Sequence, residues 1–371
     1  MRFPKRLIGF VLVIQCILFL THFLLYKTWT FSPAGPDLDP TLGEKLALGL
    51  LSVSFVAASV LAFRYTNGLV RVFYTVAAVW LGLVNFLVFA SLFSWIILAL
   101  ARLAGWSLDF HLVVEVLFGI AIASGLYAVI NANRTRTTRV KINLANLPAS
   151  WRGRRAALIS DLHLGHVRNG GFLRRMVAKI MRGKPDIVFI PGDLYDGQAI
   201  DAQRAAEPLS QLKAPYGVYF VAGNHEQFGD DTHYLRAVES AGVRVLRNEK
   251  VEVDGLQIVG VPFRNATSGR GLASLLEVMH LDRSRASIFL THAPDHPQVA
   301  EAAGYSLQLS GHTHLGQFIP WSWVVRRMYG QFAYGLSRIG NMQVFTSCGA
   351  GTWGPPLRLG SNPEIVILEF A

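Results

Sequence analysis

The fold of this chain is decided by five short stretches of sequence: Asp161-Leu162-His163, Gly192-Asp193-Leu194-Tyr195-Asp196, Gly223-Asn224-His225-Glu226, Thr291-His292 and Gly311-His312-Thr313-His314. Each follows a short apolar run that we expect to be a buried strand: 156–160, 187–190, 218–221, 288–290 and 307–309. Helix-like stretches, such as 171–182 and 202–212, lie between these runs. Strands that alternate with helices indicate an α/β domain. Because ligands bind at the carboxyl ends of strands in such sheets, we expect the five stretches to form one site.

The side chains of these stretches are typical metal ligands. They offer two carboxylates, one amide and four imidazoles, from Asp161, His163, Asp193, Asn224, His292, His312 and His314. This mixture of oxygen and nitrogen suits Mn²⁺, Fe or Zn²⁺ better than Ca²⁺ or Mg²⁺ alone. Seven ligands exceed the needs of one ion, so we expect two divalent ions that share a bridging carboxylate. Paired ions about 3.5–4 Å apart bind the attacking and leaving oxygens of a phosphoryl displacement.

Each stretch taken alone has a simpler explanation. Asp161 could cap a following helix, and Gly192-Asp193 could form an ordinary turn. Gly223-Asn224 could form a left-handed loop, because both residues tolerate that conformation. The order of all five stretches, each at the end of an apolar run, argues against these separate explanations.

In this order the motifs D-x-H, G-D-x-x-D, G-N-H-E, an isolated H and G-H-x-H resemble the calcineurin-like metallophosphoesterases over residues 155–371. The resemblance implies an α/β/β/α sandwich around a dinuclear metal site. The ligands that it implies are Asp161, His163 and His314 for one metal, Asn224, His292 and His312 for the other, and Asp193 as the bridge. It also implies that His225 contacts the phosphate and protonates the leaving group, while metal-activated water attacks directly.

The segment after the last motif suggests where a substrate binds. Residues 318–334 combine aromatic, apolar and basic side chains, and from them we expect Trp321, Trp323, Arg326 and Arg327 to bind substrate. Such a segment is suited to a membrane interface and a lipid substrate. A partly buried core loop is the alternative. The tail resembles a membrane-associated bacterial branch of the family, some members of which cleave the pyrophosphate bond of UDP-2,3-diacylglucosamine.

The N-terminal part of the chain has the composition of a membrane region. Residues 1–149 contain 12 Lys and Arg but only 5 Asp and Glu, a net charge of +7. Because a spanning helix needs about 20 apolar residues, we expect four spans: 7–26, 46–63, 72–100 and 112–130. A cleaved signal peptide is the alternative for the first, but its apolar run is long and no A-x-A site follows. We expect three regions: a transmembrane region at 1–131, a basic juxtamembrane linker at 132–154 and the phosphoesterase domain at 155–371.

The distribution of Lys and Arg predicts the orientation of a multi-pass cell-membrane protein. Basic residues gather before the first span, after the second and after the fourth, for example Arg2, Arg64 and Arg134. Because such residues are enriched in cytoplasmic loops, we expect both termini and the catalytic domain on the cytoplasmic side.

Three functions remain open at this point. The first is a hydrolase that cleaves a phosphoester or pyrophosphate bond of a lipid-linked substrate. The second is a tethered hydrolase for a soluble nucleotide or phosphoprotein, and the third is a non-catalytic metal-binding scaffold, which has no use for His225. We expect no nucleic-acid partner, because +7 of the net charge of +11 lies outside the catalytic part. The two cysteines, Cys16 and Cys348, exclude a disulfide scaffold, and nothing in the sequence indicates an oligomeric state.

Overall fold

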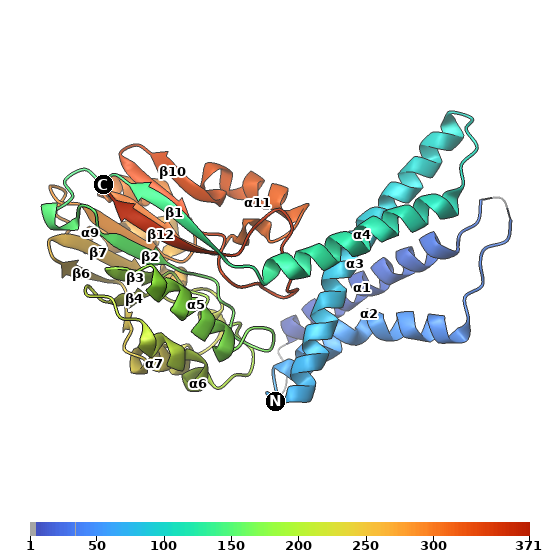
Figure 1. Ribbon diagram of the computed structural model, residues 1–371, viewed down its shortest axis with the longest axis horizontal. Coiled ribbons are helices and arrows are strands. Elements are labelled where there is room, and N and C mark those ends of the chain that lie inside the picture. Colours follow the sequence, from blue (N-terminus) through green and yellow to red (C-terminus); the bar gives the residue numbers. More distant parts are fainter. Residues whose placement is uncertain (1–4, 34) are drawn as a thin grey trace. The chain divides into compact units, whose positions relative to one another are not determined.

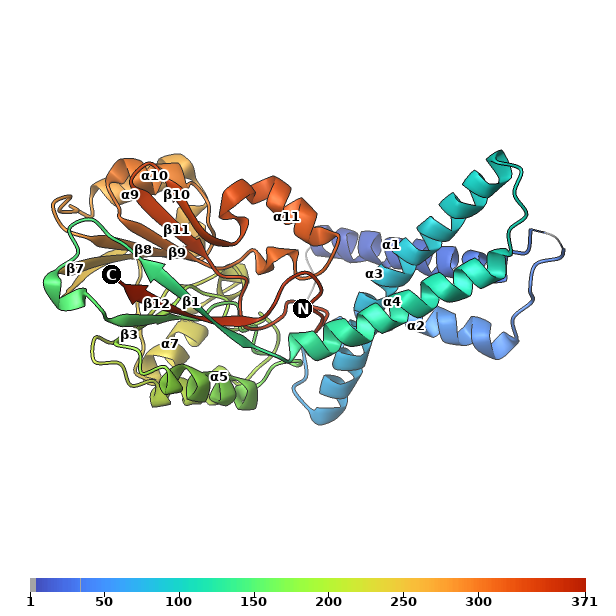
Figure 2. The same ribbon diagram turned by 45° about the horizontal axis from the view of Figure 1, so that its top comes forward.

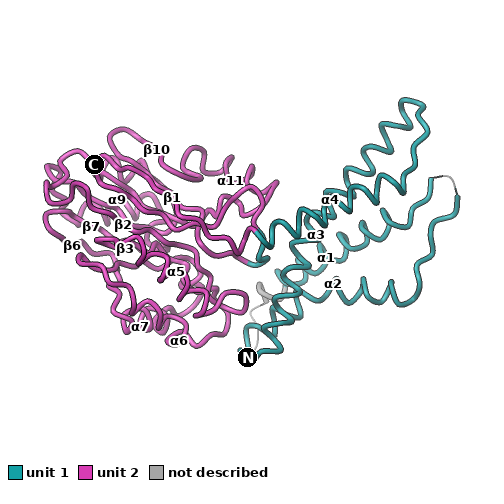
Figure 3. Tube along the Cα trace, viewed as in Figure 1, with its two compact units in different colours: residues 1–130, 354–357 teal, residues 131–353, 358–371 magenta. Residues whose placement is uncertain are grey.

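The computed structural model describes residues 5–33 and 35–371, which divide into two compact units (Figure 3). Unit 1 comprises the chain up to residue 130 together with 354–357. Unit 2 comprises 131–353 and 358–371. Arg2, on which the predicted orientation partly rests, lies outside the described residues.

Unit 1 contains the four predicted apolar helices. They are α1 (Lys5–Thr30), α2 (Leu42–Ala62), α3 (Gly68–Leu103) and α4 (Phe110–Ala132), whose last two residues belong to unit 2 (Figure 1). Each is long and apolar enough to cross a membrane. Local signals fix two of the starts: Thr41 and Glu44 form a reciprocal capping box at α2, and the Asn67 side chain caps α3.

Two polar contacts inside unit 1 tie α1 to α3. Trp80 Nε1 donates a hydrogen bond to His22 Nε2 over 3.0 Å, and Trp95 Nε1 donates to Thr28 Oγ1 over 2.9 Å. Polar side chains on apolar helices commonly bond across a helix interface in this way. His22, the ionisable group within the first predicted span, therefore has a structural partner.

Unit 2 contains two six-stranded sheets. Their strand orders are β1-β12-β2-β3-β4-β5 and β10-β11-β9-β8-β7-β6 (Figure 1). The strands of the first sheet are β1 (Arg136–Ile142), β12 (Glu364–Phe370), β2 (Arg155–Leu158), β3 (Ile187–Ile190), β4 (Val218–Phe220) and β5 (Arg244–Val245). Those of the second are β10 (Gly335–Ile339), β11 (Met342–Thr346), β9 (Leu307–Ser310), β8 (Ser287–Thr291), β7 (Leu256–Val261) and β6 (Glu249–Val253).

Unit 2 is a four-layer sandwich, because alternate side chains along a strand point to opposite faces of its sheet. Along and just after β2, Ala156 and Leu158 join the core between the sheets, whereas Ala157 and Ile159 join the core under the helices. The helices over the first sheet are α5 (Gly170–Arg182), α6 (Ala202–Ala206) and α7 (Thr232–Ser240), and those over the second are α9 (Gly269–Glu277) and α10 (Pro297–Ala303) (Figure 2). The predicted α/β/β/α sandwich is confirmed. The remaining α-helices of unit 2 are α8 (Phe263–Ala266) and α11 (Trp321–Tyr329).

Strand β1 lies within the segment that we expected to be a basic linker, and it pairs in parallel with β12. In this segment basic residues alternate with apolar ones, which is the two-residue period of a strand. Val140 and Ile142 pack toward the core between the sheets, while Arg139 and Lys141 stay exposed. The juxtamembrane segment is therefore part of the first sheet.

The direction of the strands positions the site. The strands β2, β3 and β4 run parallel to one another, as do β7, β8 and β9 in the other sheet. The loops that follow them carry all five predicted motifs.

Candidate metal centre

The structure brings all seven predicted ligands and His225 together at the strand ends, where all but the half-buried Asn224 and His312 are buried. The first sheet contributes Asp161 and His163 after β2, Asp193 after β3, and Asn224 and His225 after β4. The second sheet contributes His292 after β8, and His312 and His314 after β9. The site therefore depends on both sheets.

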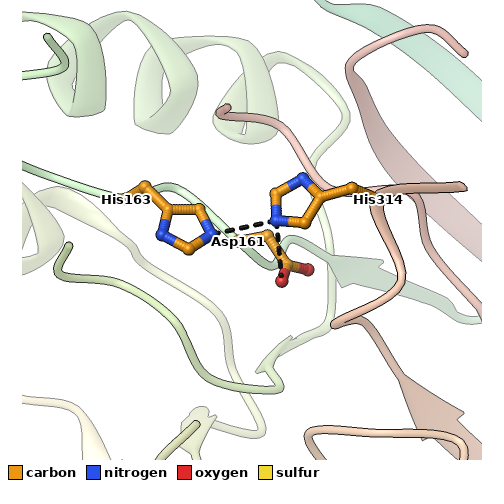
Figure 4. A group of neighbouring side chains, drawn as sticks. All are labelled: Asp161, His163 and His314. Atoms are coloured by element: carbon orange, nitrogen blue, oxygen red, sulfur yellow. Dashed lines mark hydrogen bonds and ion pairs between the residues drawn. The ribbon is translucent and has the colours of Figure 1, made fainter. Parts of the chain in front are cut away.

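Asp161, His163 and His314 form the first cluster (Figure 4). His163 Nε2 lies 2.9 Å from His314 Nε2, and the latter lies 3.6 Å from Asp161 Oδ1. All three side chains are buried. Two imidazole nitrogens that face each other so closely can share a single proton or a single cation.

Asn224, His292 and His312 form the second cluster. Asn224 Oδ1 lies 2.9 Å from His292 Nε2 and 3.0 Å from His312 Nδ1, and these two nitrogens are 3.1 Å apart. Asp193 stands between the clusters: its Oδ2 lies 3.2 Å from His292 Nε2 and 3.8 Å from His163 Nε2. This is the position that a bridging carboxylate requires.

The donor set fits two divalent ions. Its nitrogens and oxygens form three groups of neighbouring donors, each with all its atoms within 4.8 Å of one another. Asp193 belongs to two of these groups, and His163 also belongs to two. The choice among Mn²⁺, Fe and Zn²⁺ stays a prediction, because imidazole and carboxylate ligands serve all three.

Burial and neighbouring charge set the protonation of the imidazoles. Burial lowers the pKa of His292, but the Asp193 carboxylate outweighs it and raises this pKa to about 10. Burial and the adjacent His292 lower the pKa of His312 to about 3. Burial and His163 also lower the pKa of His225. His312 is therefore the neutral imidazole, the form that binds metal, whereas His292 is a charged partner of Asp193 and must lose its proton to bind an ion.

Backbone strain is concentrated at the ligands. Five of the seven have left-handed φ angles: Asp161 at 54°, His163 at 49°, Asp193 at 51°, His312 at 71° and His314 at 47°. This conformation is uncommon for residues other than glycine. It costs about 1–3 kcal/mol each and clusters at functional sites.

The motif glycines are required by close approach of the loops. A Cβ atom on Gly223 would lie 2.1 Å from Asp193 Oδ1, and one on Gly311 would lie 2.3 Å from Asp161 Oδ2. Both distances are far shorter than a van der Waals contact between carbon and oxygen. The glycines therefore let the loops come close enough for their carboxylates to meet the imidazoles.

Two carboxylates around the ligands position them. The buried Glu226 side chain accepts hydrogen bonds from the backbone amides of Asp193, Tyr195 and Gly223, over 3.0, 2.9 and 2.8 Å. Burial and the Asp193 charge raise the pKa of Glu226 to about 7. Asp196 Oδ1 lies 3.3 Å from His163 Nδ1 and 3.7 Å from His225 Nδ1. Glu226 thus holds the loops together, and Asp196 faces two of the rings.

Sequence reasoning missed Arg358. Its fully buried guanidinium donates to His314 Nδ1 and to the backbone carbonyls of His314, Cys348 and Gly351. These contacts fix the His314 ring with Nε2 toward the first cluster. No motif marks Arg358, because it lies 44 residues from His314 in the chain.

The four residues predicted to bind substrate lie on α11, outside both ligand clusters. Trp321 is 48% exposed and Trp323 is 67% exposed, and Arg326 and Arg327 are exposed as well. The segment is also partly buried, because Val325 and Tyr329 of α11 pack against the buried Leu315 and Cys348. The end of α11 approaches the site, because the Tyr329 ring lies 6.3 Å from that of His312. Their role in binding stays a prediction.

Comparisons with known proteins relate this chain to metallophosphoesterases. The model of the calcineurin-like phosphoesterase family matches residues 154–316. An uncharacterized metallophosphoesterase of Campylobacter jejuni is 29% identical over 328 residues, which cover 86% of this chain and 87% of the relative. One of Aquifex aeolicus is 32% identical over 68% of this chain and 97% of its own length. A transmembrane protein with a metallophosphoesterase domain from Danio rerio is 31% identical, over 68% of this chain and 62% of its own length.

The close approach at Gly223 predicts the effect of adding one methyl group. We expect Gly223→Ala to weaken Mn²⁺ binding about tenfold or more, because the new Cβ displaces Asp193 from its ligand position. Calorimetric titration of the full-length chain in detergent measures the affinity. The matched control is Gly229→Ala, because a Cβ there has no neighbour within 4 Å. Unchanged affinity in Gly223→Ala would contradict the role given to this glycine.

Proposed function

Because the chain belongs to the calcineurin-like phosphoesterase family and is a metal-dependent phosphoester hydrolase, we propose that it cleaves a phosphoester or pyrophosphate bond. We further propose that its substrate is linked to a lipid and lies at a membrane. The observation that carries the proposal is the position of α11. An exposed apolar and basic helix directly follows the loop that holds His312 and His314. A lipid-linked substrate such as UDP-2,3-diacylglucosamine has both a phosphate group for the metal centre and acyl chains for the exposed apolar side chains of α11.

The residues of the centre have separate tasks in this reaction. Asp161, His163 and His314 would hold one ion. Asn224, His292 and His312 would hold the other, and Asp193 would contact both ions. Bound there, the ions would lower the pKa of water, which makes it a nucleophile near neutral pH, and would neutralise charge on the phosphoryl oxygens. His225, with Asp196 beside it, donates a proton to the leaving oxygen.

The lipid part of the proposal rests on exposed apolar surface. On α11, Trp321, Trp323 and Met328 are 48–69% exposed. Arg326 and Arg327 on the same helix can meet anionic headgroups. Helices that combine aromatic and basic residues in this way lie in membrane interfaces. The four apolar helices of unit 1 support a membrane location for the enzyme.

We also propose that the catalytic unit faces the cytoplasm, on the Lys and Arg distribution. Fusions of green fluorescent protein and of alkaline phosphatase after residue 371 measure the side. We expect fluorescence from the first fusion and no phosphatase activity from the second. The reverse result would overturn the orientation and remove UDP-sugars as substrates.

The catalytic proposal is tested by hydrolysis with detergent-purified, Mn²⁺-loaded protein. We expect cleavage of bis-p-nitrophenyl phosphate and, with higher kcat/KM, of UDP-2,3-diacylglucosamine. Asp193→Asn should lower both rates at least 100-fold, because it removes the carboxylate that contacts both clusters. Absence of cleavage of both substrates by protein with bound metal would contradict the proposal.

The same assay separates a lipid-linked substrate from a soluble one. We expect the double variant Trp321→Ala/Trp323→Ala to lose about tenfold in kcat/KM for the lipid and to keep its activity on bis-p-nitrophenyl phosphate. Both tryptophans are exposed, so their removal leaves no cavity in the core. Equal kcat/KM values of wild type and variant for the lipid would favour a tethered hydrolase for a soluble substrate.

A further inference from the structure

Two exposed aromatic rings flank the histidine that donates the proton. His225 is only 7% exposed, whereas Phe228 is 69% exposed and Trp353 is 60% exposed. The Phe228 ring centroid lies 4.6 Å from that of His225, and the Trp353 ring lies 6.3 Å away in an edge-on arrangement. Neither aromatic residue belongs to a metal-ligand motif or to α11.

The backbone of each aromatic residue is joined to a loop of the candidate centre. The Gln317 side chain accepts a hydrogen bond from Trp353 N over 2.8 Å and donates one to Trp353 O over 3.0 Å. Gln317 itself closes the loop that carries the last ligand, His314. On the other side, Phe228 ends the short turn that begins with the buried Glu226. Both residues thus belong to segments joined to the loops of the candidate centre, while their side chains stay largely exposed.

We propose that Phe228 and Trp353 bind an apolar group on the leaving oxygen of the substrate, and so select for substrates that carry one. This inference rests on the proposed function, because His225 identifies the leaving side. A water oxygen forms a bond to phosphorus and loses a proton to solvent. The bond from phosphorus to the leaving oxygen breaks, and that oxygen takes the proton of His225, which is replaced from solvent. The group attached to that oxygen therefore leaves past the residues next to His225.

The chemistry of the two rings indicates the ligand class. Each ring can bury a large apolar area and can stack on a flat aryl group or cover an alkyl chain. A polar leaving group, such as glycerol or a small sugar, would gain little from either ring and would lose hydration there. An aryl or acyl-bearing group fits, and the two can be told apart by measurement.

Binding to the metal-loaded, full-length chain in detergent gives a test that does not depend on turnover. We expect diphenyl phosphate or dihexyl phosphate to bind at least tenfold more tightly than dimethyl phosphate, and the tighter of the two identifies an aryl or an alkyl preference. Phe228→Ala and Trp353→Ala should each reduce this preference to about threefold or less, with dimethyl phosphate binding unchanged. The control is Val278→Ala, which removes an exposed apolar side chain from the end of α9. A preference that persists in both variants, or is absent from wild type, would overturn the proposal.

Kinetics then assign the rings to the leaving side. Bis-p-nitrophenyl phosphate and methyl p-nitrophenyl phosphate release the same p-nitrophenolate but differ in the ester that is retained. We expect Trp353→Ala to lower kcat/KM about tenfold for both, and Trp353→Phe to recover most of the loss. A loss confined to the bis-aryl substrate would place the ring on the retained side and contradict the proposal. If wild type cleaves neither diester, the proposed function fails, whereas the binding preference still decides whether the rings form a subsite.

Discussion

A single buried carboxylate, Asp193, links the two sheets of unit 2 at the candidate metal centre. It follows a strand of the first sheet, and its Oδ2 lies 3.2 Å from His292 Nε2, which follows a strand of the second. Burial alone would raise the pKa of Asp193, but the imidazoles of His292, His163 and His225 hold that pKa below its usual range. The carboxylate thus stays charged in a place where charge is costly unless it is paired.

The surrounding structure supplies the geometry that this carboxylate needs. Gly223 leaves room for its oxygen, and Glu226 binds the backbone amides of Asp193 and of Gly223. Left-handed φ angles at five ligands add a cost that the packed cores of the sandwich must offset. The residues that pack the sheets and those that make the site are therefore distinct, and the first set holds the second in a strained arrangement.

The sequence predicted that these residues lie close together, because each motif directly follows its strand. The run 187–190 coincides with β3, and the loop after it places Asp193 as expected. The features that the sequence did not predict depend on contacts between residues far apart in the chain. Strand β1 pairs with β12, which lies more than 200 residues further on, and Arg358 reaches His314 from a segment without any motif. Side chains such as Trp353 gain a role only through the loop that carries them to the site.

We propose that two ions share Asp193 between the two clusters. Anomalous X-ray diffraction from crystals of the Mn²⁺-loaded protein tests it most directly. We expect two peaks about 3.5–4 Å apart. One should lie among Asp161, His163 and His314, the other beside Asn224, His292 and His312, and both within bonding distance of the Asp193 carboxylate. A single peak, or two peaks of which only one contacts Asp193, would contradict it.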